Sequence, residues 1–281
     1  DLTPAGDGPA DAADASAPGV PTFSKIPSGT FQMGSPTSEP CRSTGEDLHT
    51  VQLTHEFELA ETETTQAQYQ ALMGANPSYF KTCGSSCPVD FVSWHQAAAF
   101  CNAVSAKLGK APCYSCSGSG MSTSCALKAA YAGAKIYSCT GYRLPTEAEW
   151  EHAYRAGTST PLYNGAIASC TGKDAHADAI GWYASNTAKV APRPVRGLKA
   201  NAFGLYDMAG NMAEWVHDLY EASLGTAKVT DPWGAASGTR SAVRGGSWYS
   251  EPGSLRGAHR KTALQRNSAF NFTGFRCART R

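Results

Sequence analysis

The apolar positions of this chain follow helical spacing in three places, and each place begins with a capping signal. A Thr or Ser is followed three residues later by Gln or Glu, the pattern of a capping box, at Thr65, Ser93 and Thr146. Apolar residues then recur every three or four positions, and a Gly follows each stretch, at positions 74, 109 and 157. The pattern predicts helices over about 65–74, 93–109 and 146–157.

Short apolar segments predict strands that are few and brief. These segments are residues 30–33, 51–59, 135–138, 241–244 and 274–278. Long stretches rich in Gly, Ser, Asn and Trp separate them. We therefore expect an α+β domain with little regular structure and many loops, a kind of domain that depends on cross-links for its stability.

The first twenty residues differ in composition from the rest. Ala, Asp, Pro and Gly occupy 16 of these 20 positions, and no basic or aromatic residue is present. Such a segment cannot bury enough apolar surface to offset its chain entropy, so we predict a disordered linker over 1–20 and one domain over 21–281. Because the chain begins with Asp, we expect an upstream signal to have been removed or omitted. A lipid or surface tether upstream of residue 1 would suit such a linker, and an artificial chain end is the alternative.

The charge balance and the cysteine count narrow the class of protein. The 24 basic and 23 acidic residues give a net charge of +1, so we expect no nucleic-acid partner. The sequence has no run of about 18 apolar residues, and we expect no transmembrane segment. Ten cysteines indicate an oxidising compartment, so we expect an extracellular, cell-surface or periplasmic protein.

Seven segments in a fixed order resemble a known family. They are GTFQMGS (29–35), ETTQAQY (63–69), PVDFVSW (88–94), YRLPTEAEWE (142–151), NAFGLYDMAGNMAEW (201–215), RGGSW (244–248) and GFRCA (274–278). Together they resemble the formylglycine-generating enzyme (sulfatase-modifying factor) family over about residues 22–280, and several motifs in register are a specific signal. The resemblance implies a single-domain variant of the C-type-lectin fold, with a Cys-rich insertion at 110–139 that the simplest members lack.

The resemblance does not extend to the copper site of the family's oxidases. Those enzymes bind copper(I) through two cysteines that lie five residues apart after the Gly-Gly-Ser segment, and thiolates are the soft ligands that suit this ion. The two positions fall on Ser250 and Leu255 here, and residues 246–260 contain no cysteine. We therefore expect no copper and no formylglycine synthesis by the known route. The iron-dependent relatives use a His-x-x-x-His-x-Glu pattern, and none of the seven histidines lies four residues from another.

The calcium motif of the family is better preserved. By the resemblance, the side chains of Asp207 and Glu214 and the backbone carbonyls of Gly210 and Met212 would bind a structural Ca²⁺ ion. Carboxylate and carbonyl oxygens are the ligands that Ca²⁺ prefers. The alternative is a capped loop whose carboxylates accept hydrogen bonds from backbone amides.

The resemblance also implies one disulfide, between Cys101 in the second predicted helix and Cys277 near the C-terminus. Short separations favour three further pairs and elimination leaves a last one; these are Cys83–Cys87, Cys116–Cys125, Cys113–Cys139 and Cys41–Cys170. The spacing of Cys113 and Cys116 is also that of a redox or zinc pair, although no second pair follows at zinc spacing. The sequence alone leaves the connectivity open.

Two functions from different classes fit these observations. The first is a secreted or cell-surface binding module without catalysis, which holds a peptide, protein or glycan in the groove that corresponds to the enzymes' active site. We expect this groove to be lined by Trp248, Tyr249, Glu251, Arg256, His259 and Arg260, since aromatic and Arg side chains are enriched in binding sites. Trp248 and Arg260 have an alternative interpretation as core and ion-pair residues. The second function is an oxidoreductase with altered metal chemistry, for which the sequence contains no positive feature.

Overall fold

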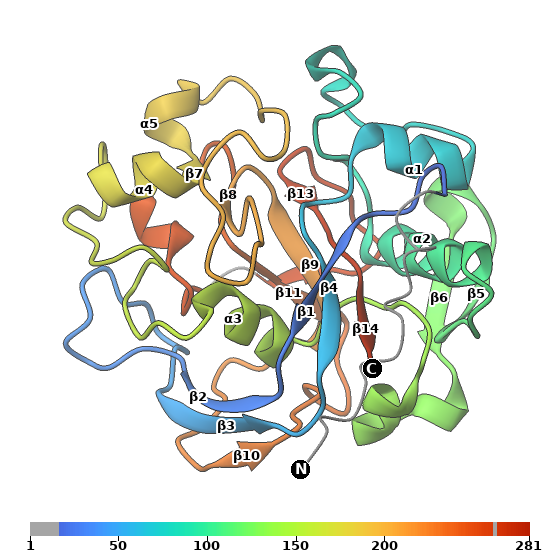
Figure 1. Cartoon of the computed structure of the whole chain (residues 1–281), viewed down its shortest axis with the longest axis horizontal. Helices are drawn as coiled ribbons and strands as arrows, with labels where there is room; N and C mark the ends of the chain where they lie inside the picture. Colours follow the sequence, from blue (N-terminus) through green and yellow to red (C-terminus); the bar gives the residue numbers. More distant parts are fainter. Residues whose placement is uncertain (1–16, 261–262) are drawn as a thin grey trace, which may run out of the picture.

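Three helices begin where the capping boxes predict. The computed structural model describes residues 17–260 and 263–281, and it contains α1 (Gln66–Met73), α2 (Trp94–Lys107) and α3 (Glu147–Arg155), as Figure 1 shows. In each helix the N-cap hydroxyl accepts the amide of the third helical residue, whose side chain in turn accepts the N-cap amide. The three predicted helices are confirmed, because a capping box is decided within one turn of chain.

The ends of two of these helices are set by residues in the left-handed conformation. Gly74 ends α1 with a φ of 78°, and Ala156 ends α3 with a φ of 45°, one residue before the predicted stop. The other helical segments are α4 (Ala175–Ile180), α5 (Ala184–Thr187) and the 3-10 turns η1 (Lys81–Cys83), η2 (Gly120–Ser122), η3 (Ala129–Tyr131), η4 (Gly133–Ser138) and η5 (Pro252–Leu255). The strand predicted at 135–138 is wrong, because this segment lies in η4; a short apolar run does not distinguish a strand from a helical turn.

The strands are short and join into small sheets. Their bounds are β1 (Phe23–Ile26), β2 (Gly29–Met33), β3 (His49–Leu53), β4 (Phe57–Ala60), β5 (Tyr114–Ser117), β6 (Ser124–Leu127), β7 (Gly181–Trp182), β8 (Ala209–Gly210), β9 (Ala213–Leu219), β10 (Val229–Thr230), β11 (Arg240–Arg244), β12 (Ala263–Gln265), β13 (Thr273–Gly274) and β14 (Ala278–Thr280). The sheet orders are β1-β4-β14, β10-β3-β2, β12-β11-β9-β13, β5-β6 and β7-β8. The strands predicted at 30–33 and 241–244 are confirmed. Those predicted at 51–59 and 274–278 are each divided into two strands that join different sheets.

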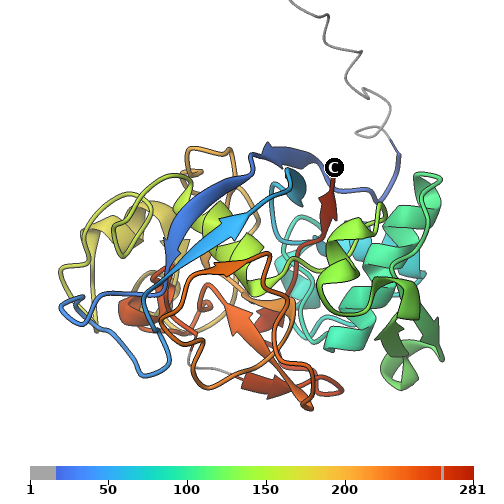
Figure 2. The same ribbon diagram turned by 90° about the horizontal axis from the view of Figure 1, so that it is seen from below.

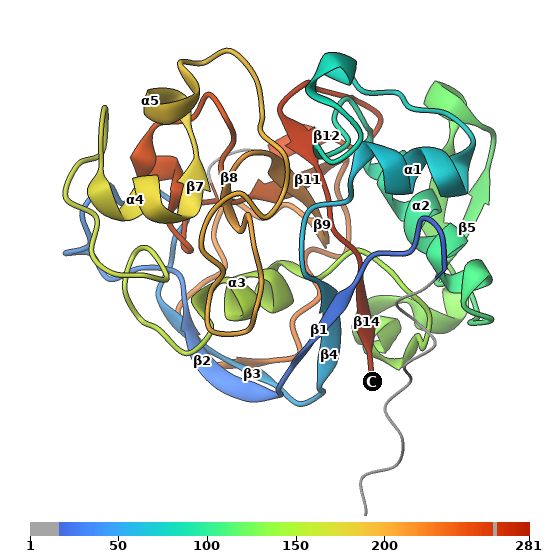
Figure 3. The ribbon, with the colours of Figure 1, turned by 45° about the horizontal axis from the view of Figure 1, so that its top comes forward.

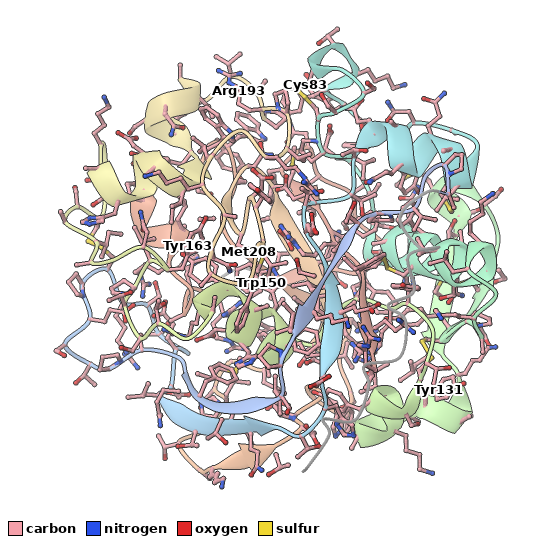
Figure 4. All side chains as sticks on the ribbon, in the orientation of Figure 1. Cys83, Tyr131, Trp150, Tyr163, Arg193 and Met208 are labelled. Carbon is pink, nitrogen blue, oxygen red and sulfur yellow. A yellow bond between two sulfur atoms is a disulfide. The ribbon has the colours of Figure 1, made fainter. Side chains whose placement is uncertain are left out.

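Strand β9 separates two clusters of buried apolar side chains. The first cluster includes Trp150, Tyr163 and Met208, which Figure 4 labels close together beside α3. The second surrounds α2. Val216 of β9 belongs to the first cluster and its neighbour Trp215 to the second, because successive residues of a strand point to opposite faces.

Five disulfides use all ten cysteines of the sequence. They are Cys41–Cys170, Cys83–Cys87, Cys101–Cys277, Cys113–Cys139 and Cys116–Cys125. All five predicted pairs are confirmed. Cys113 and Cys116 have different partners, so they do not form a redox or zinc pair with each other. This density of disulfides is compatible with an extracellular or periplasmic protein.

The Cys-rich insertion lies on one side of the molecule, next to α2, and is green in Figures 1 and 2. Strands β5 and β6 form an antiparallel hairpin in which Cys116 lies opposite Cys125. The Cys113–Cys139 bond joins the two ends of the insertion. Two of the five disulfides therefore lie within this one segment.

The predicted linker is described only at its end, since residues 1–16 lie outside the described residues. Val20 is buried in the second cluster, and a side chain on Gly19 would collide with Ala71 and Leu72 of α1. The end of the predicted linker, at Gly19 and Val20, therefore packs against α1 and the second cluster. No helix of the described residues combines the length and the apolar composition needed to cross a membrane.

Candidate functional site

The segment after β11 carries Ser250 and Leu255, the two positions on which the resemblance places the copper cysteines of the family's oxidases. The Ser250 hydroxyl accepts the amide of Ser247 at 3.0 Å, in the turn that follows β11. Leu255 is fully buried in the first cluster, and its carbonyl accepts the hydroxyl of Tyr154 at 2.6 Å. One position therefore presents a hydroxyl group, and the other is part of the core.

A small cavity of about 100 Å³ lies beside Ser250. Tyr249 and His259 of the predicted groove line it together with Phe272. This volume corresponds to about three water molecules. A peptide or a sugar would therefore have to lie on the surface around the cavity rather than inside it.

Six aromatic rings form a continuous row next to this cavity, and we call them the aromatic row. In order of contact they are Tyr79, Phe80, Trp248, Tyr249, Phe272 and Phe270. Successive ring centroids lie 5.0 to 5.3 Å apart, within the range of favourable ring contacts. Tyr79 is 67% exposed and Tyr249 is 39% exposed, whereas Trp248 is buried. Figure 3 shows two of the contributing loops, the one before η1 (teal) and the one after β12 (red), side by side.

Buried polar groups hold the row in place. The carboxylate of Asp90 accepts the amides of Tyr79 at 2.8 Å and Phe80 at 3.2 Å. Burial raises the pKa of Asp90 to about 6, although these two hydrogen bonds oppose the shift. The indole of Trp248 donates to the carbonyl of Asn271 at 3.1 Å. The sequence analysis found only two of the six rings, because the others come from segments far away in the chain.

Two residues of the predicted groove lie in the interior instead. Arg256 donates to Glu39 at 2.7 Å and to both oxygens of Glu46 at 2.7 and 2.8 Å. Arg260 donates to both oxygens of Glu147 at 2.8 and 3.1 Å. Both Arg side chains are at most 1% exposed, so they cannot line an open groove, and this part of the prediction is wrong. The alternative interpretation of Arg260 as an ion-pair residue is correct.

Glu251 follows Ser250 at the surface but does not line the small cavity. Its carboxylate accepts the amide of Gly172 at 2.9 Å and pairs with Lys189 at 3.0 Å. The hydrogen bond from Gly172, followed by that from Lys189, lowers the pKa of Glu251. The candidate site is therefore the aromatic row with Ser250 and His259 in the adjoining cavity and Glu251 at its edge.

The two carboxylates of the predicted calcium site are buried near β8. Asp207 is 3% exposed and Glu214 is 1% exposed. Asp207 accepts the amide of Arg196 at 2.8 Å, and burial raises the pKa of Asp207 to about 6. Glu214 pairs with Arg276 at 2.7 Å and accepts the indole of Trp150 at 2.9 Å. Both carboxylates thus have protein partners, and the calcium site stays a prediction.

A third buried acid, Glu63, adjoins these two and is missed by the sequence analysis. Its carboxylate accepts the amide of Met212 and the side-chain amide of Asn211, both at 2.7 Å. Burial, followed by the charges of Asp207 and Glu214, raises the pKa of Glu63 well above its usual value. Across residues 17–260 and 263–281, no group of three or more His, Cys, Asp or Glu side chains is arranged to hold a metal ion on its own. A Ca²⁺ ion here would therefore need the two backbone carbonyls of the motif. Glu63 begins the ETTQAQY motif and Glu61 lies outside it, but nothing in that motif predicts a buried acid.

Known proteins resemble this chain over nearly its whole length. Residues 9–281 match the family described as the sulfatase-modifying factor enzyme 1-like domain. Variable protein 1 of Treponema denticola has a similar structure, with a TM-score of 0.77 and 31% sequence identity over 92% of this chain and 95% of that one.

Curated relatives match about half of the chain. A protein named serine/threonine-protein kinase pkn1 from Chlamydia caviae is 40% identical over 144 residues, which are 48% of this chain and 21% of the relative. A formylglycine-generating enzyme from Streptomyces coelicolor is 33% identical over 152 residues, which are 48% of this chain and 46% of the relative. The chain thus matches between about a fifth and a half of the length of these relatives. Because the family match covers nearly all of its residues, the chain belongs to the sulfatase-modifying factor enzyme 1-like family, which includes the formylglycine-generating enzymes.

Proposed function

We propose that this chain is a binding module that acts outside the cytoplasm, recognises a peptide or a glycan through the aromatic row, and carries out no catalysis. The observation that carries the proposal is the row of six contacting rings, which lies beside Ser250, where the family's oxidases have a copper cysteine. Tyr79 and Tyr249 of this row are exposed, and aromatic side chains are enriched in interaction sites. The five disulfides support a location in an oxidising compartment.

Aromatic side chains suit such a role for an energetic reason. Tyr and Trp present a large contact area and have only two rotatable side-chain bonds, so their entropy cost on binding is low. In this protein the row is also anchored before any ligand arrives, through Asp90 and the Trp248 indole. Ser250, His259 and Glu251 would supply polar contacts at its edge.

Substitution of Tyr249, which is exposed, or of Phe272, which is partly buried, should weaken binding without unfolding the protein. We expect Tyr249→Ala and Phe272→Ala each to weaken binding of a ligand found on a peptide and glycan array by about five- to thirtyfold, as for central aromatic residues of interfaces. The measurement is the dissociation constant of the array ligand for each purified variant, together with the melting temperature.

The matched control for these variants is Met121→Ala. Met121 is 59% exposed and lies in the Cys-rich insertion, so it removes apolar surface away from the row. If Met121→Ala weakened binding as much as Tyr249→Ala, the ligand would not bind at the aromatic row.

Catalysis can be tested directly on the same protein. The purified chain with copper or iron, oxygen and a Cys-x-Pro-x-Arg peptide should leave the peptide thiol unchanged, because Ser250 and Leu255 offer no thiolate to copper(I). Mass spectrometry of the peptide measures this outcome. Oxidised peptide at a measurable turnover would contradict the binding-module proposal and favour the oxidoreductase.

We also propose that Ca²⁺ stabilises the segment around β8. The three buried carboxylates of Glu63, Asp207 and Glu214 lie near a single buried guanidinium, Arg276, and this excess of negative charge fits a divalent cation with hard oxygen ligands. Removal of Ca²⁺ with EDTA should lower the melting temperature by about 5 °C relative to protein with Ca²⁺ at a hundred times its dissociation constant. Thermal unfolding with EDTA, with Ca²⁺ and with Mg²⁺ measures the effect.

Variants separate calcium binding from general stability. Asp207→Asn should remove the response to Ca²⁺, whereas the exposed Glu56→Gln should retain it. A wild-type melting temperature that is the same in EDTA and in Ca²⁺ would instead support the interpretation of this segment as a capped loop.

A further inference from the structure

A second cavity, of about 400 Å³, lies apart from the aromatic row. It is enclosed by β3 and β10, the start of α3, the end of β9 and the loop at 231–234. Figure 1 shows β2, β3 and β10 along the lower edge of the molecule, with α3 above them. The cavity shares no lining residue with the small cavity beside Ser250, and its volume is in the range of pockets for small organic molecules.

The charged groups that line this cavity are predominantly acidic. Four carboxylates line it, those of Glu147, Asp218, Glu221 and Asp231, and none of its described lining residues is Lys or Arg. The basic side chain in the wall is His49, whose Nδ1 lies 2.7 Å from the carbonyl of Asp47. The lining therefore complements a positive charge.

Glu147 already has two cationic partners within the protein. Its carboxylate pairs with Arg244 and Arg260, and both guanidinium groups are buried. These two arginines compensate the negative charge of Glu147. The remaining acids are Glu221, Asp218, which is only 4% exposed, and Asp231, whose carboxylate accepts the amide and the hydroxyl of Thr54.

Asp218 is partly committed to structure. Its Oδ2 accepts the amide of Glu147 at 2.7 Å, at the first turn of α3. Burial and the charge of Glu147 raise the pKa of Asp218 well above its usual value, so a nearby cation would favour its ionised form. Gly234, with a φ of +87°, faces this side chain, and a Cβ there would lie 2.7 Å from the Cβ of Asp218. Glycine thus allows the 231–234 loop to pack directly against this acid.

The rest of the cavity wall is apolar. Leu224, Val229 and the half-buried Trp233 line it together with the acids. An aromatic ring attracts a cation through its face, and an aliphatic chain gains from burial against such a wall. The cavity therefore combines a recognition element for positive charge with one for an apolar stem.

We propose that this cavity binds a small organic cation, in which an ammonium group is carried on an apolar carbon chain. The ammonium group donates hydrogen bonds to the carboxylates of Asp218 and Glu221, and the chain lies against Trp233. This site is independent of the binding function proposed for the aromatic row.

The test is isothermal titration calorimetry of the whole chain with cadaverine (1,5-diaminopentane), in parallel with 1,5-pentanediol and glutarate. The expected result is saturable binding of cadaverine and none of the neutral diol or the anion. Asp218→Asn retains an oxygen acceptor for the Glu147 amide and should weaken cadaverine binding by about tenfold or more, as for lost hydrogen bonds between charged groups. Glu61→Gln, in a surface acid that pairs with Arg196, should leave the affinity unchanged.

Two further arms keep the test decisive. Glu221→Gln changes a less buried acid and serves where Asp218→Asn does not fold. N-acetyl-lysine methylamide carries the same ammonium group on a peptide unit. Tighter binding of this compound than of cadaverine assigns the cavity to a lysine side chain of a partner, and tighter binding of cadaverine assigns it to a free amine. Either result supports the cation site. Binding of 1,5-pentanediol as tight as that of cadaverine, or cadaverine binding that is absent or insensitive to both substitutions, would overturn the proposal.

Discussion

Removal of the Cys101–Cys277 disulfide should lower the free energy of unfolding by about 5 kcal/mol. The bond joins residues 176 positions apart, and the cost of closing a loop of that length in the unfolded chain is of this size in the chain-entropy account. Both cysteines are fully buried in the second cluster, so the double variant Cys101→Ala/Cys277→Ala avoids placing a polar group there. Urea-induced unfolding of the oxidised protein measures the loss.

The Cys83–Cys87 disulfide is a control with the same chemistry. It closes a loop of only four residues, so Cys83→Ala/Cys87→Ala should cost about 2 kcal/mol or less by the same relation. Figure 4 shows Cys83 at the edge of the molecule near Arg193, away from both core clusters. Equal losses for the two double variants would show that loop length does not decide the contribution of these bonds.

Substitution of Arg256 should lower the stability of the protein rather than weaken ligand binding. Arg256→Met removes the positive charge between Glu39 and Glu46 and leaves two buried carboxylates without their partner. Breaking a buried ion pair in this way costs about 3 to 5 kcal/mol, a large part of the stability of an ordinary domain. The free energy of unfolding of the variant, measured in urea, checks this expectation.

Two comparisons separate this effect from the loss of any arginine. Arg240→Met, at an exposed position in β11, should change stability little. The triple variant Arg256→Met/Glu39→Gln/Glu46→Gln removes both unpaired charges and should recover part of the loss, since the three groups act as one network. If Arg256→Met were as stable as the wild type but bound the array ligand more weakly, Arg256 would belong to the binding site after all.

The elements predicted correctly from the sequence are those that short-range interactions decide. Thr65, Ser93 and Thr146 each satisfy helix amides within three residues, so the positions at which their helices start are fixed locally. The strands predicted at 51–59 and 274–278 were each too long, because sheet membership depends on partners far away in the chain. In both segments the chain leaves one sheet and joins another.

Most disulfide pairs could also be predicted from the sequence, for two different reasons. The pairs within the insertion and at 83–87 are close in the sequence, and the resemblance to the family implied Cys101–Cys277. Only Cys41 and Cys170 then remained. These two residues lie 129 positions apart, and no motif links them. Their pairing therefore follows only if the other four pairs are correct.

The sequence by itself determined the family, the starts of three helices and the absence of cysteine from residues 246–260, because each of these depends on residue identity or on short spacing. Only the tertiary structure decided which polar side chains are accessible. Arg256 and Arg260 belong to a residue type that is enriched in binding sites. In the structure they are buried against Glu46 and Glu147. The aromatic row and the acidic cavity each combine residues from segments that lie far apart in the sequence. These sites form only when folding brings those segments into contact.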